Sequence, residues 1–451
     1  MEILIKTAQL ILSLSILVVL HEMGHFFPAK WFKMRVEKFY LFFDPWFSLF
    51  KIKKGDTEYG IGWIPLGGYV KIAGMIDESM DKEQMKKPPQ DWEFRSKPAW
   101  QRLIVMVGGV TMNLILAVVI YAMLMYAYGE RYLPTANLTD GIWCVDSLAQ
   151  DIGFKNGDKI LTVDDKKVEN FQNLTHEMLY AKTVQIQRNR KDTTINVPKD
   201  FKKNLISTFS KKSKKGSPFF YPRIPFYIGG FSPGSPAEKA GIKKKDQVIG
   251  VNNSDFKYYD EFKTIIAPFR NQSVTLKIKR GDEILNIPVQ VDTGGKIGVA
   301  FAFMDLTSLK TAGYYELSIT KYGFLESFPK GIERASEKLT DYIRQFKLIF
   351  DFETEAYKGV GSFLTIGDLF PPAWDWEPFW ELTAFLSIML AFMNILPIPA
   401  LDGGHVLFLL YEVVTGRKPS EKFLEYAQYV GMFLLLSLMV YAIGNDILRL
   451  F

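Results

Sequence analysis

The sequence LIVMVGGVTMNLILAVVIYAMLMYAY, residues 103–128, carries no charged side chain. A helix needs about 20 mainly apolar residues, each adding about 1.5 Å, to cross a bilayer. This stretch meets that length without help from its neighbours. The segments 3–20, 382–401 and 429–443 are similarly apolar and reach it with their flanking residues. We therefore expect a polytopic α-helical membrane protein with four transmembrane helices.

The composition adds soluble parts to this membrane core. Of the 451 residues, 48% are hydrophobic but 23% are charged, which is too many for a bundle of membrane helices alone. The net charge of +6 includes lysine clusters such as KKSKKG at 211–216, which we interpret as a solvated loop. Because no nucleic-acid motif accompanies them, we expect no nucleic-acid partner. The single cysteine, Cys144, excludes an internal disulfide and a cysteine-built zinc site.

The loop after the first apolar segment is rich in lysine and arginine, which is typical of the cytoplasmic side of a membrane. Within it, TEYGIGWIPLGGYVKIAGM (57–75) alternates apolar and polar residues, with glycines at the bends. This pattern predicts a β-hairpin or small sheet. It is so apolar that we expect it to lie against the membrane or dip into it. The acidic run Asp77–Pro98 is interpreted as a linker to the second span.

A long polar region between the second and third spans contains an internal repeat. DSLAQDIGFKNGDKILTVDD (146–165) aligns without gaps on GSPAEKAGIKKKDQVIGVNN (234–253). Each copy predicts a short helix that ends at a glycine, then a polar turn and a strand. The second copy resembles the PDZ domains of bacterial proteases, and the first copy matches more weakly. PDZ domains add extended peptides to a sheet edge, so these two could bind peptide C-termini; a spacer or a size filter is the open alternative.

These observations give a scheme of nine segments. They are a first span with its motif (1–33), a membrane-associated loop containing 57–75 (34–100), a second span (101–128), two α/β PDZ-like domains (129–215 and 216–304), an amphipathic helical region (305–376), a third span (377–404), a cytoplasmic loop (405–424) and a fourth span (425–447).

The motif His21-Glu22-Met23-Gly24-His25 follows the first apolar run. Positions four apart lie on one face of a helix, so both imidazoles can reach one zinc ion. The glutamate between them is placed to act as general base on a water molecule. The alternative is a purely structural polar cluster satisfied by neighbouring helices. Charged groups are costly inside a bilayer, which favours the metal site.

A third ligand is needed, and two candidates follow the third apolar segment in MNILPIPALDGGH (393–405). The prolines and glycines are expected to break the helix there, which is tolerated at membrane depth beside a protein-walled site. Asp402 in this stretch would complete a set of two histidines and one carboxylate. His405 is the rival ligand, ranked lower because it lies beyond the glycine pair. The remaining histidine, His176, belongs to the polar region.

The pairing of HEMGH with NILPIPALDGG resembles the site-2 protease family of intramembrane zinc metalloproteases. The span order, the GGYVKIAGM stretch and two inserted PDZ domains are similar to its bacterial regulator-of-sigma-E branch. This resemblance implies the following roles: zinc ligands His21, His25 and Asp402; general base Glu22; substrate path Asn394, Pro397 and Pro399; substrate pairing and close approach Gly67, Gly68 and Tyr69. Asn113 is either a polar partner of the site or part of a helix–helix hydrogen bond.

The resemblance implies a Zn²⁺-dependent endopeptidase of the bacterial inner membrane that cuts transmembrane segments of single-span proteins. Anti-sigma factors and remnant signal peptides are the substrates that the family suggests. The PDZ-like domains would lie outside the cytoplasm and the active site near the cytoplasmic side of the phospholipid bilayer. Two other functions remain open: a catalytically silent scaffold or chaperone that binds peptides through its PDZ domains, and a membrane-anchored peptidase acting on soluble peptides.

Overall fold

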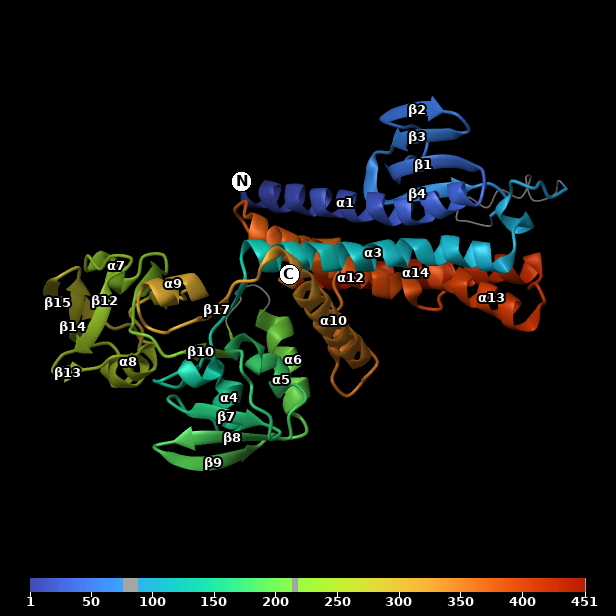
Figure 1. Cartoon of the computed structure of the whole chain (residues 1–451). Coiled ribbons are helices and arrows are strands. Elements are labelled where there is room, and N and C mark those ends of the chain that lie inside the picture. Colours follow the sequence, from blue (N-terminus) through green and yellow to red (C-terminus); the bar gives the residue numbers. More distant parts are fainter. Residues whose placement is uncertain (76–87, 213–217, 451) are drawn as a thin grey trace. The chain divides into compact units, whose positions relative to one another are not determined.

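The computed structural model describes residues 1–75, 88–212 and 218–450. It contains two compact units (Figure 1). One is Met1–Gly129 with Lys321–Phe451, and the other is Glu130–Thr320. Half of the linker predicted at Asp77–Pro98, and most of the lysine cluster at 211–216, lie outside the described residues.

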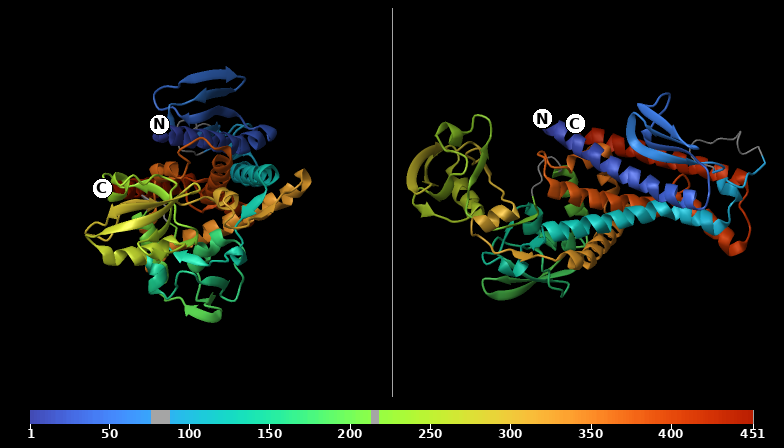
Figure 2. Two further views of the ribbon diagram at one scale, coloured as in Figure 1. Left: turned by 90° about the vertical axis from the view of Figure 1, so that its left-hand side faces the viewer. Right: turned by 45° about the horizontal axis from the view of Figure 1, so that its top comes forward.

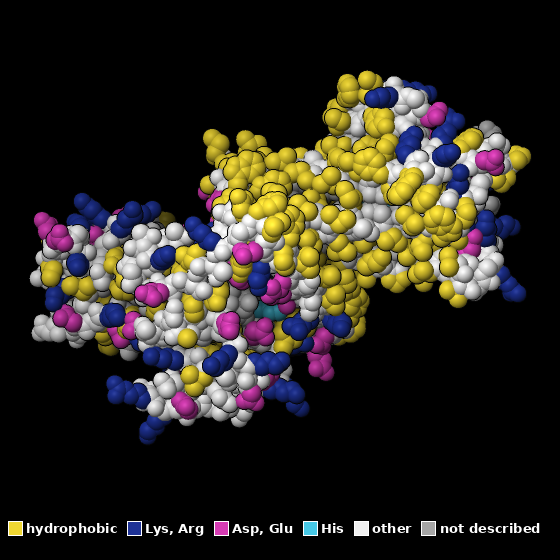
Figure 3. Space-filling model, viewed as in Figure 1, with side chains coloured by type: hydrophobic (Ala, Val, Ile, Leu, Met, Phe, Trp, Pro, Cys, Tyr) yellow, Lys and Arg dark blue, Asp and Glu magenta, His cyan; other side chains and the backbone are white. Residues whose placement is uncertain are grey.

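Four helices of the first unit are long and apolar enough to cross a membrane, among the residues described. They are α1 (Glu2–Trp31), α3 (Ala99–Ala127), α12 (Trp376–Ile395) and α14 (Glu421–Leu450). Hydrophobic side chains cover these helices on the face shown in Figure 3, as expected for contact with lipid tails. The expected polytopic membrane protein is thus confirmed.

The helix α10 (Phe324–Ile349) is the amphipathic helix expected in the 305–376 region. Its Ala335 packs with Ile120 and Tyr121 of α3 and with Ile388 of α12 in one apolar cluster. Packing against the bundle, one of the two roles possible for such a helix, is therefore the one found. The short helices η5 (Ala356–Gly359) and α11 (Phe363–Asp368) follow it.

The expectation of a loop over 405–424 is wrong, because helix α13 occupies Asp402–Thr415. The prolines of NILPIPALDGG break the chain after Ile395, but the two glycines lie in the first turn of α13. A Cβ on Gly403 would collide with the backbone of Ile395 and Leu396, and one on Gly404 would collide with that of Ile398. The glycines therefore serve close packing of the new helix against the break, and they do not interrupt it.

A four-stranded sheet follows α1, with strands β1 (Val36–Phe43), β2 (Phe50–Lys54), β3 (Thr57–Ile61) and β4 (Ile64–Ile72) in the order β2-β3-β1-β4. The expected small sheet exists, but 57–75 is not a hairpin. The strand β3 runs parallel to β1, and β4 pairs antiparallel with the other side of β1. The central place of β1 leaves β4 at an edge.

The second unit contains two larger sheets. One is β7 (Lys159–Val163), β8 (Thr183–Arg188) and β9 (Lys191–Asn196); the other has the order β13-β12-β14-β15, with β12 (Gln247–Val251), β13 (Ser254–Asp255), β14 (Ser273–Arg280) and β15 (Glu283–Gln290). Three strand pairs, β10-β6, β11-β16 and β17-β5, complete this unit, whose larger sheets are the green and yellow arrows of Figure 2. The bounds of these pairs are β5 (Glu130–Tyr132), β6 (Ile142–Cys144), β10 (Phe220–Pro222), β11 (Ile228–Phe231), β16 (Val299–Phe301) and β17 (Ser318–Thr320).

The helices of this unit are short. They are α4 (Ser147–Asp151), α5 (Leu174–Met178), α6 (Phe201–Lys212), α7 (Pro236–Lys239), α8 (Tyr259–Ile266) and α9 (Leu306–Thr311).

The two sequence copies make the same buried contacts. Asp158 pairs with Arg188 at 2.7 Å, and its carboxylate also accepts a hydrogen bond from the backbone of Lys155. Asp246 pairs in the same way with Arg280 at 2.7 Å and accepts from the backbone of Lys243. In each copy, one carboxylate therefore ties the turn before a strand to the neighbouring strand.

Candidate metal centre

The site is built where α1 crosses α3. A Cβ on Gly24 would collide with Gly108, and a Cβ on Gly108 would collide with Gly24, so the two helix backbones touch at this point. A Cβ on Gly109 would occupy the space of the His25 and His21 imidazoles. Glycines in both helices therefore make room for the two histidine rings between them.

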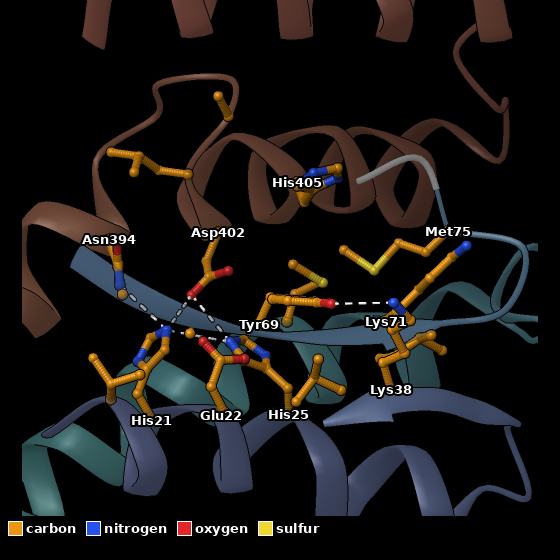
Figure 4. A pocket seen from close by; sticks show the side chains of 18 of the residues that line it. His21, Glu22, His25, Lys38, Tyr69, Lys71, Met75, Asn394, Asp402 and His405 are labelled. Atoms are coloured by element: carbon orange, nitrogen blue, oxygen red, sulfur yellow. Dashed lines mark hydrogen bonds and ion pairs between the residues drawn. The ribbon is translucent and has the colours of Figure 1, made fainter. Parts of the chain in front are cut away.

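The structure brings His21, His25 and Asp402 together (Figure 4). The Asp402 Oδ2 atom lies 3.2 Å from Nε2 of His21 and 3.3 Å from Nε2 of His25. The two Nε2 atoms are 3.4 Å apart. Both imidazoles are buried, and the Asp402 side chain is 16% exposed. Three ligand atoms from α1 and α13 thus form a nearly equilateral triangle.

Hydrogen bonds to the outer nitrogens orient both rings. His25 Nδ1 lies 2.8 Å from the carbonyl oxygen of Val105, so Nδ1 must donate and Nε2 faces the cluster. His21 Nδ1 lies 3.0 Å from the side-chain amide of Asn113. An amide can donate to Nδ1 or, after rotation, accept from it. Only acceptance by Oδ1 leaves Nε2 of His21 unprotonated toward Asp402. Asn113 is therefore a partner of the site.

The break between α12 and α13 positions the carboxylate. Ala400 in this break has the left-handed value φ +80°, which is unfavourable for alanine. Its backbone N–H donates to Oε1 of Gln428 at 3.1 Å, and a Cβ on Gly431 would collide with Pro399. Both partners belong to α14. The last helix therefore supports the loop that delivers Asp402.

The other predicted residues lie at different distances from the cluster. Asn394 Nδ2 is 3.3 Å from Nε2 of His21, at the end of α12. His405 lies on α13 and lines the same cavity but is not part of the triangle. His176 lies in α5 of the second unit. Pro397 and Pro399 lie in the break between the helices, and neither is among the described residues that line the cavity.

The three ligand atoms fit a zinc ion by chemistry and spacing. Two imidazoles and one carboxylate are a usual catalytic zinc set, with bonds of about 2.0 to 2.2 Å. A tetrahedral ion with such bonds separates its ligand atoms by about 3.3 Å, close to the 3.2, 3.3 and 3.4 Å found here. Asp402 Oδ2 also has no well-directed hydrogen-bond donor among the described residues, despite its burial. A buried carboxylate oxygen in this state is suited to a cation.

A cavity of about 550 Å³ opens onto the cluster. Glu22 lines it, and the backbone of Val70 in β4 hydrogen-bonds to the Glu22 carboxylate. The residues of β4 from Gly67 to Ile72 form one wall. Gly68 was expected to let a substrate approach closely, but the space that its side chain would need is filled by the protein itself. A Cβ there would lie 2.6 Å from Val18 and 2.6 Å from the Tyr40 carbonyl oxygen. Its small size serves the packing of β4 on α1 and β1.

Several residues of the site could not be predicted from the sequence. Tertiary contacts alone connect three residues to the site, and nothing in their local sequence identifies them. They are Gly109 and Val105, which contact the histidine rings, and Gln428, which binds the backbone of Ala400. The sequence left two roles possible for Asn113. Its polar side chain inside a charge-free span was the one feature that pointed to the site. Lys38 also lines the cavity, although it sits among the many lysines of the loop.

Comparison with known proteins gives the family. The model of "Peptidase family M50" matches residues 9–438. The chain is 29% identical to the regulator of sigma E protease of Haemophilus influenzae, with 100% of each chain covered. Two proteins named "Putative zinc metalloprotease", from Rickettsia conorii and Neisseria meningitidis, are 28% and 26% identical, with 98% of each chain covered. The match along nearly the whole sequence shows that this chain belongs to peptidase family M50, the site-2 protease family.

Proposed function

We propose that this protein is an intramembrane zinc metalloprotease that cuts within the transmembrane segments of single-span membrane proteins. The observation that carries this proposal is one cavity shared by three groups of residues: the His21–His25–Asp402 triangle, the Glu22 carboxylate and the free edge of β4. His21, Glu22 and His25 all come from a helix that is apolar enough to cross a bilayer.

His21, His25 and Asp402 would hold the zinc ion through the three atoms that face one another. A zinc ion in such a site polarises a carbonyl group and makes a bound water acidic. Glu22 lines the same cavity and carries the only carboxylate besides Asp402 among the described residues there. It would take a proton from the attacking water and pass it to the leaving amide nitrogen.

The free edge of β4 would hold the substrate. A transmembrane helix satisfies its own backbone hydrogen bonds, so its peptide bonds must be released before they can be attacked. Strand β4 pairs only with β1 among the described strands, so its other edge pairs with no described strand, and on it the backbone of Val70 meets Glu22. An unwound substrate could add there as a further strand. Tyr69 and the backbone of Gly67 and Gly68 would contact it, and Asn394 would lie at the far side.

The distribution of charge supports a site toward the cytoplasmic side of a bacterial inner membrane. Basic residues gather where α1 ends, where α3 begins and between α13 and α14: Lys30, Lys33, Arg95, Lys97, Arg102, Arg417 and Lys418. The Lys418 ammonium donates to the Arg95 carbonyl oxygen at 3.3 Å, so two of these clusters meet at one end of the bundle. Basic loops are retained on the cytoplasmic side. Unit Glu130–Thr320 follows the opposite end of α3 and would lie outside the cytoplasm.

The sheet offers a contact with the bilayer. Trp46, Phe47, Leu49, Phe50 and Ile52 are each more than half exposed in the β1–β2 loop and β2. Trp63 stacks on both Trp46 and Phe47. Exposed aromatic and aliphatic side chains next to lysines are typical of membrane interfaces. The membrane-facing part of the sheet would therefore be its outer strands and loop, and β4 would remain at the cavity.

The second unit would act as two PDZ-like domains, 129–215 and 216–304. The paired contacts of Asp158 with Arg188 and of Asp246 with Arg280 support a common origin of the two halves. These domains would bind peptide termini or exclude substrates whose outer domain is still attached. Deletion of both should leave cleavage of short, already trimmed substrates intact. Loss of that cleavage would contradict the filter.

The test of the activity is Glu22→Gln in the full chain, assayed in detergent on a labelled single-span substrate. We expect cleavage to fall to background while zinc content, measured by mass spectrometry, stays near one ion per chain. Glu2→Gln, at the start of the same helix, is the matched control and should remain active. Mapping the cut by mass spectrometry separates the proposal from a surface peptidase, which would cut outside the apolar segment. Full activity of Glu22→Gln would refute the proposal.

A further inference from the structure

The wall of the cavity formed by the sheet carries a positive charge that the proposed chemistry does not use. Lys38 of β1 and Lys71 of β4 both line the cavity. Lys71 pairs with Glu37 at 3.4 Å. Lys38, in contrast, makes no ion pair with any carboxylate in the described part of the chain, and its side chain is half-buried.

The Lys38 ammonium is held in place by tyrosines. Its Nζ lies 3.5 Å from the Tyr69 hydroxyl (Figure 4). It also lies over the Tyr40 ring, 5.3 Å from the centroid. The Tyr69 ring is stacked between those of Tyr40 and Phe43. Its hydroxyl donates to Asp44 at 2.8 Å, so only its oxygen lone pair faces Lys38. The cation is therefore positioned toward the cavity.

The two carboxylates beside these tyrosines are bound by other donors and form no ion pair with Lys38. Glu58, the partner of Lys38 in the β1–β3 register, accepts a hydrogen bond from the Tyr40 hydroxyl at 2.7 Å. Asp44 accepts from the Tyr69 hydroxyl and, at 3.0 Å, from Ser48 Oγ. A half-buried ammonium group has lost part of its water, and a charged hydrogen-bond acceptor restores the lost free energy better than a neutral one. This side of the cavity therefore favours an anionic group of a bound molecule.

The register of the sheet shows where such a group would sit. Lys38 lies opposite Lys71, and Tyr40 opposite Tyr69, whereas Val70, whose backbone meets Glu22, lies opposite Phe39. Side chains alternate between the two faces of a strand. If a peptide adds to the β4 edge, one of its residues lies opposite Val70. The residue before or after that one would therefore direct its side chain to the face of the sheet that carries Lys38.

We propose that Lys38 is a specificity-determining residue that recognises an aspartate or glutamate side chain of the substrate, next to the residue that pairs with Val70. The inference rests on the proposed protease function and on strand addition at β4. The acidic side chain would occupy the open side of the ammonium group, opposite the Tyr40 ring.

The experiment uses the full chain in detergent and a set of single-span substrates. A single glutamate is moved through each of six positions around the mapped cut, with glutamine at the same position as the neutral partner. We expect one position at which glutamate raises kcat/KM about tenfold over glutamine, the size of a charge-assisted hydrogen bond of about 1.4 kcal/mol. Lys38→Met should abolish this ratio, and Lys38→Glu should instead favour lysine at that position. Lys51→Met, an exposed lysine of β2, is the matched control and should keep the ratio.

The outcomes separate this inference from the protease function itself. Equal cleavage of all substrates by the unaltered chain, or a glutamate preference that persists in Lys38→Met, overturns the role of Lys38 and leaves the protease in place. A uniform loss over all substrates in Lys38→Met, with no rescue by a lysine substrate in Lys38→Glu, also overturns it. No cleavage of any substrate by the unaltered chain, as in Glu22→Gln, overturns both proposals.

Discussion

The side-chain amide of Asn113 lies 3.0 Å from Nδ1 of His21, and both groups are buried between α1 and α3. Asn113 is therefore positioned to select the protonation state of a ring whose other nitrogen faces Asp402. Partners of this kind fix the orientation of a metal-binding histidine, and their loss lowers metal affinity about 10- to 100-fold.

Replacement of Asn113 by alanine should therefore weaken zinc binding by about that factor, because His21 loses the group that orients it. Asn113→Asp should retain most of the affinity, since a carboxylate can only accept the Nδ1–H. Competition with a fluorescent chelator measures both. Thr111→Ala, two residues away on the exposed side of α3, is the control. Equal affinities of the alanine and aspartate variants would contradict this role.

Gly109→Ala should abolish metal binding, because the added methyl group would occupy the position of the His25 ring. The substitution keeps the helix propensity of α3 high, so the loss should exceed any effect on folding. Gly444→Ala in α14 is the matched control, since nothing lies within 4 Å of the added carbon. It should leave zinc content unchanged and raise stability by about 0.5 to 1 kcal/mol. Normal zinc content in Gly109→Ala would show that the rings can shift.

The elements that local sequence encodes were predictable, and those that depend on packing were not. The motif at His21, Glu22 and His25 and the carboxylate at Asp402 each carry a local signal, and the structure joins them. The place of β1 between β3 and β4 has no such signal, because a parallel pairing of β1 with β3 depends on the whole sheet.

The glycines illustrate the same limit. The pair Gly403-Gly404 is typical of a turn in sequence, but both residues lie inside α13. The adjacent backbone there fills the space that a side chain would need. Likewise, Gly68 serves contacts with Val18 and Tyr40 that lie far away in the sequence. A glycine marks a close approach, but the sequence does not say what approaches it.

Asp446 should be the main attachment of α14 at its C-terminal end. Its carboxylate accepts hydrogen bonds from the backbone N–H and the hydroxyl of Ser362, and from both groups of Thr365. Asp446→Ala should leave the start of α11 without these acceptors and cost about 2 kcal/mol. Hydrogen exchange over 356–368 should then accelerate about 30-fold. Ser437→Ala, which bonds only within α14, is the control; unchanged exchange in Asp446→Ala would contradict the attachment.

The acid stability of the second unit should depend on Asp246. Burial raises the pKa of this carboxyl, but the hydrogen bonds from Arg280 and from the backbone of Lys243 lower it by more. The pKa of Asp246 is therefore below the usual value of 3.8. Because the folded pKa lies below that of the unfolded chain, the stabilisation is complete above about pH 4 and is lost as the pH falls through the folded pKa. Asp246→Asn should therefore lower stability at pH 7 and reduce its decline below about pH 4.

Limited proteolysis of the full chain at a series of pH values measures this decline, with cleavage inside Glu130–Thr320 as the readout. Asp255→Asn is the control, because the Asp255 side chain is 70% exposed and its contact with Lys277 is open to water. It should leave the pH profile unchanged. An Asp246→Asn profile that stays parallel to that of the unaltered chain below pH 4 would show that Asp246 does not link this unit to pH, because the lost ion pair would then contribute equally at every pH.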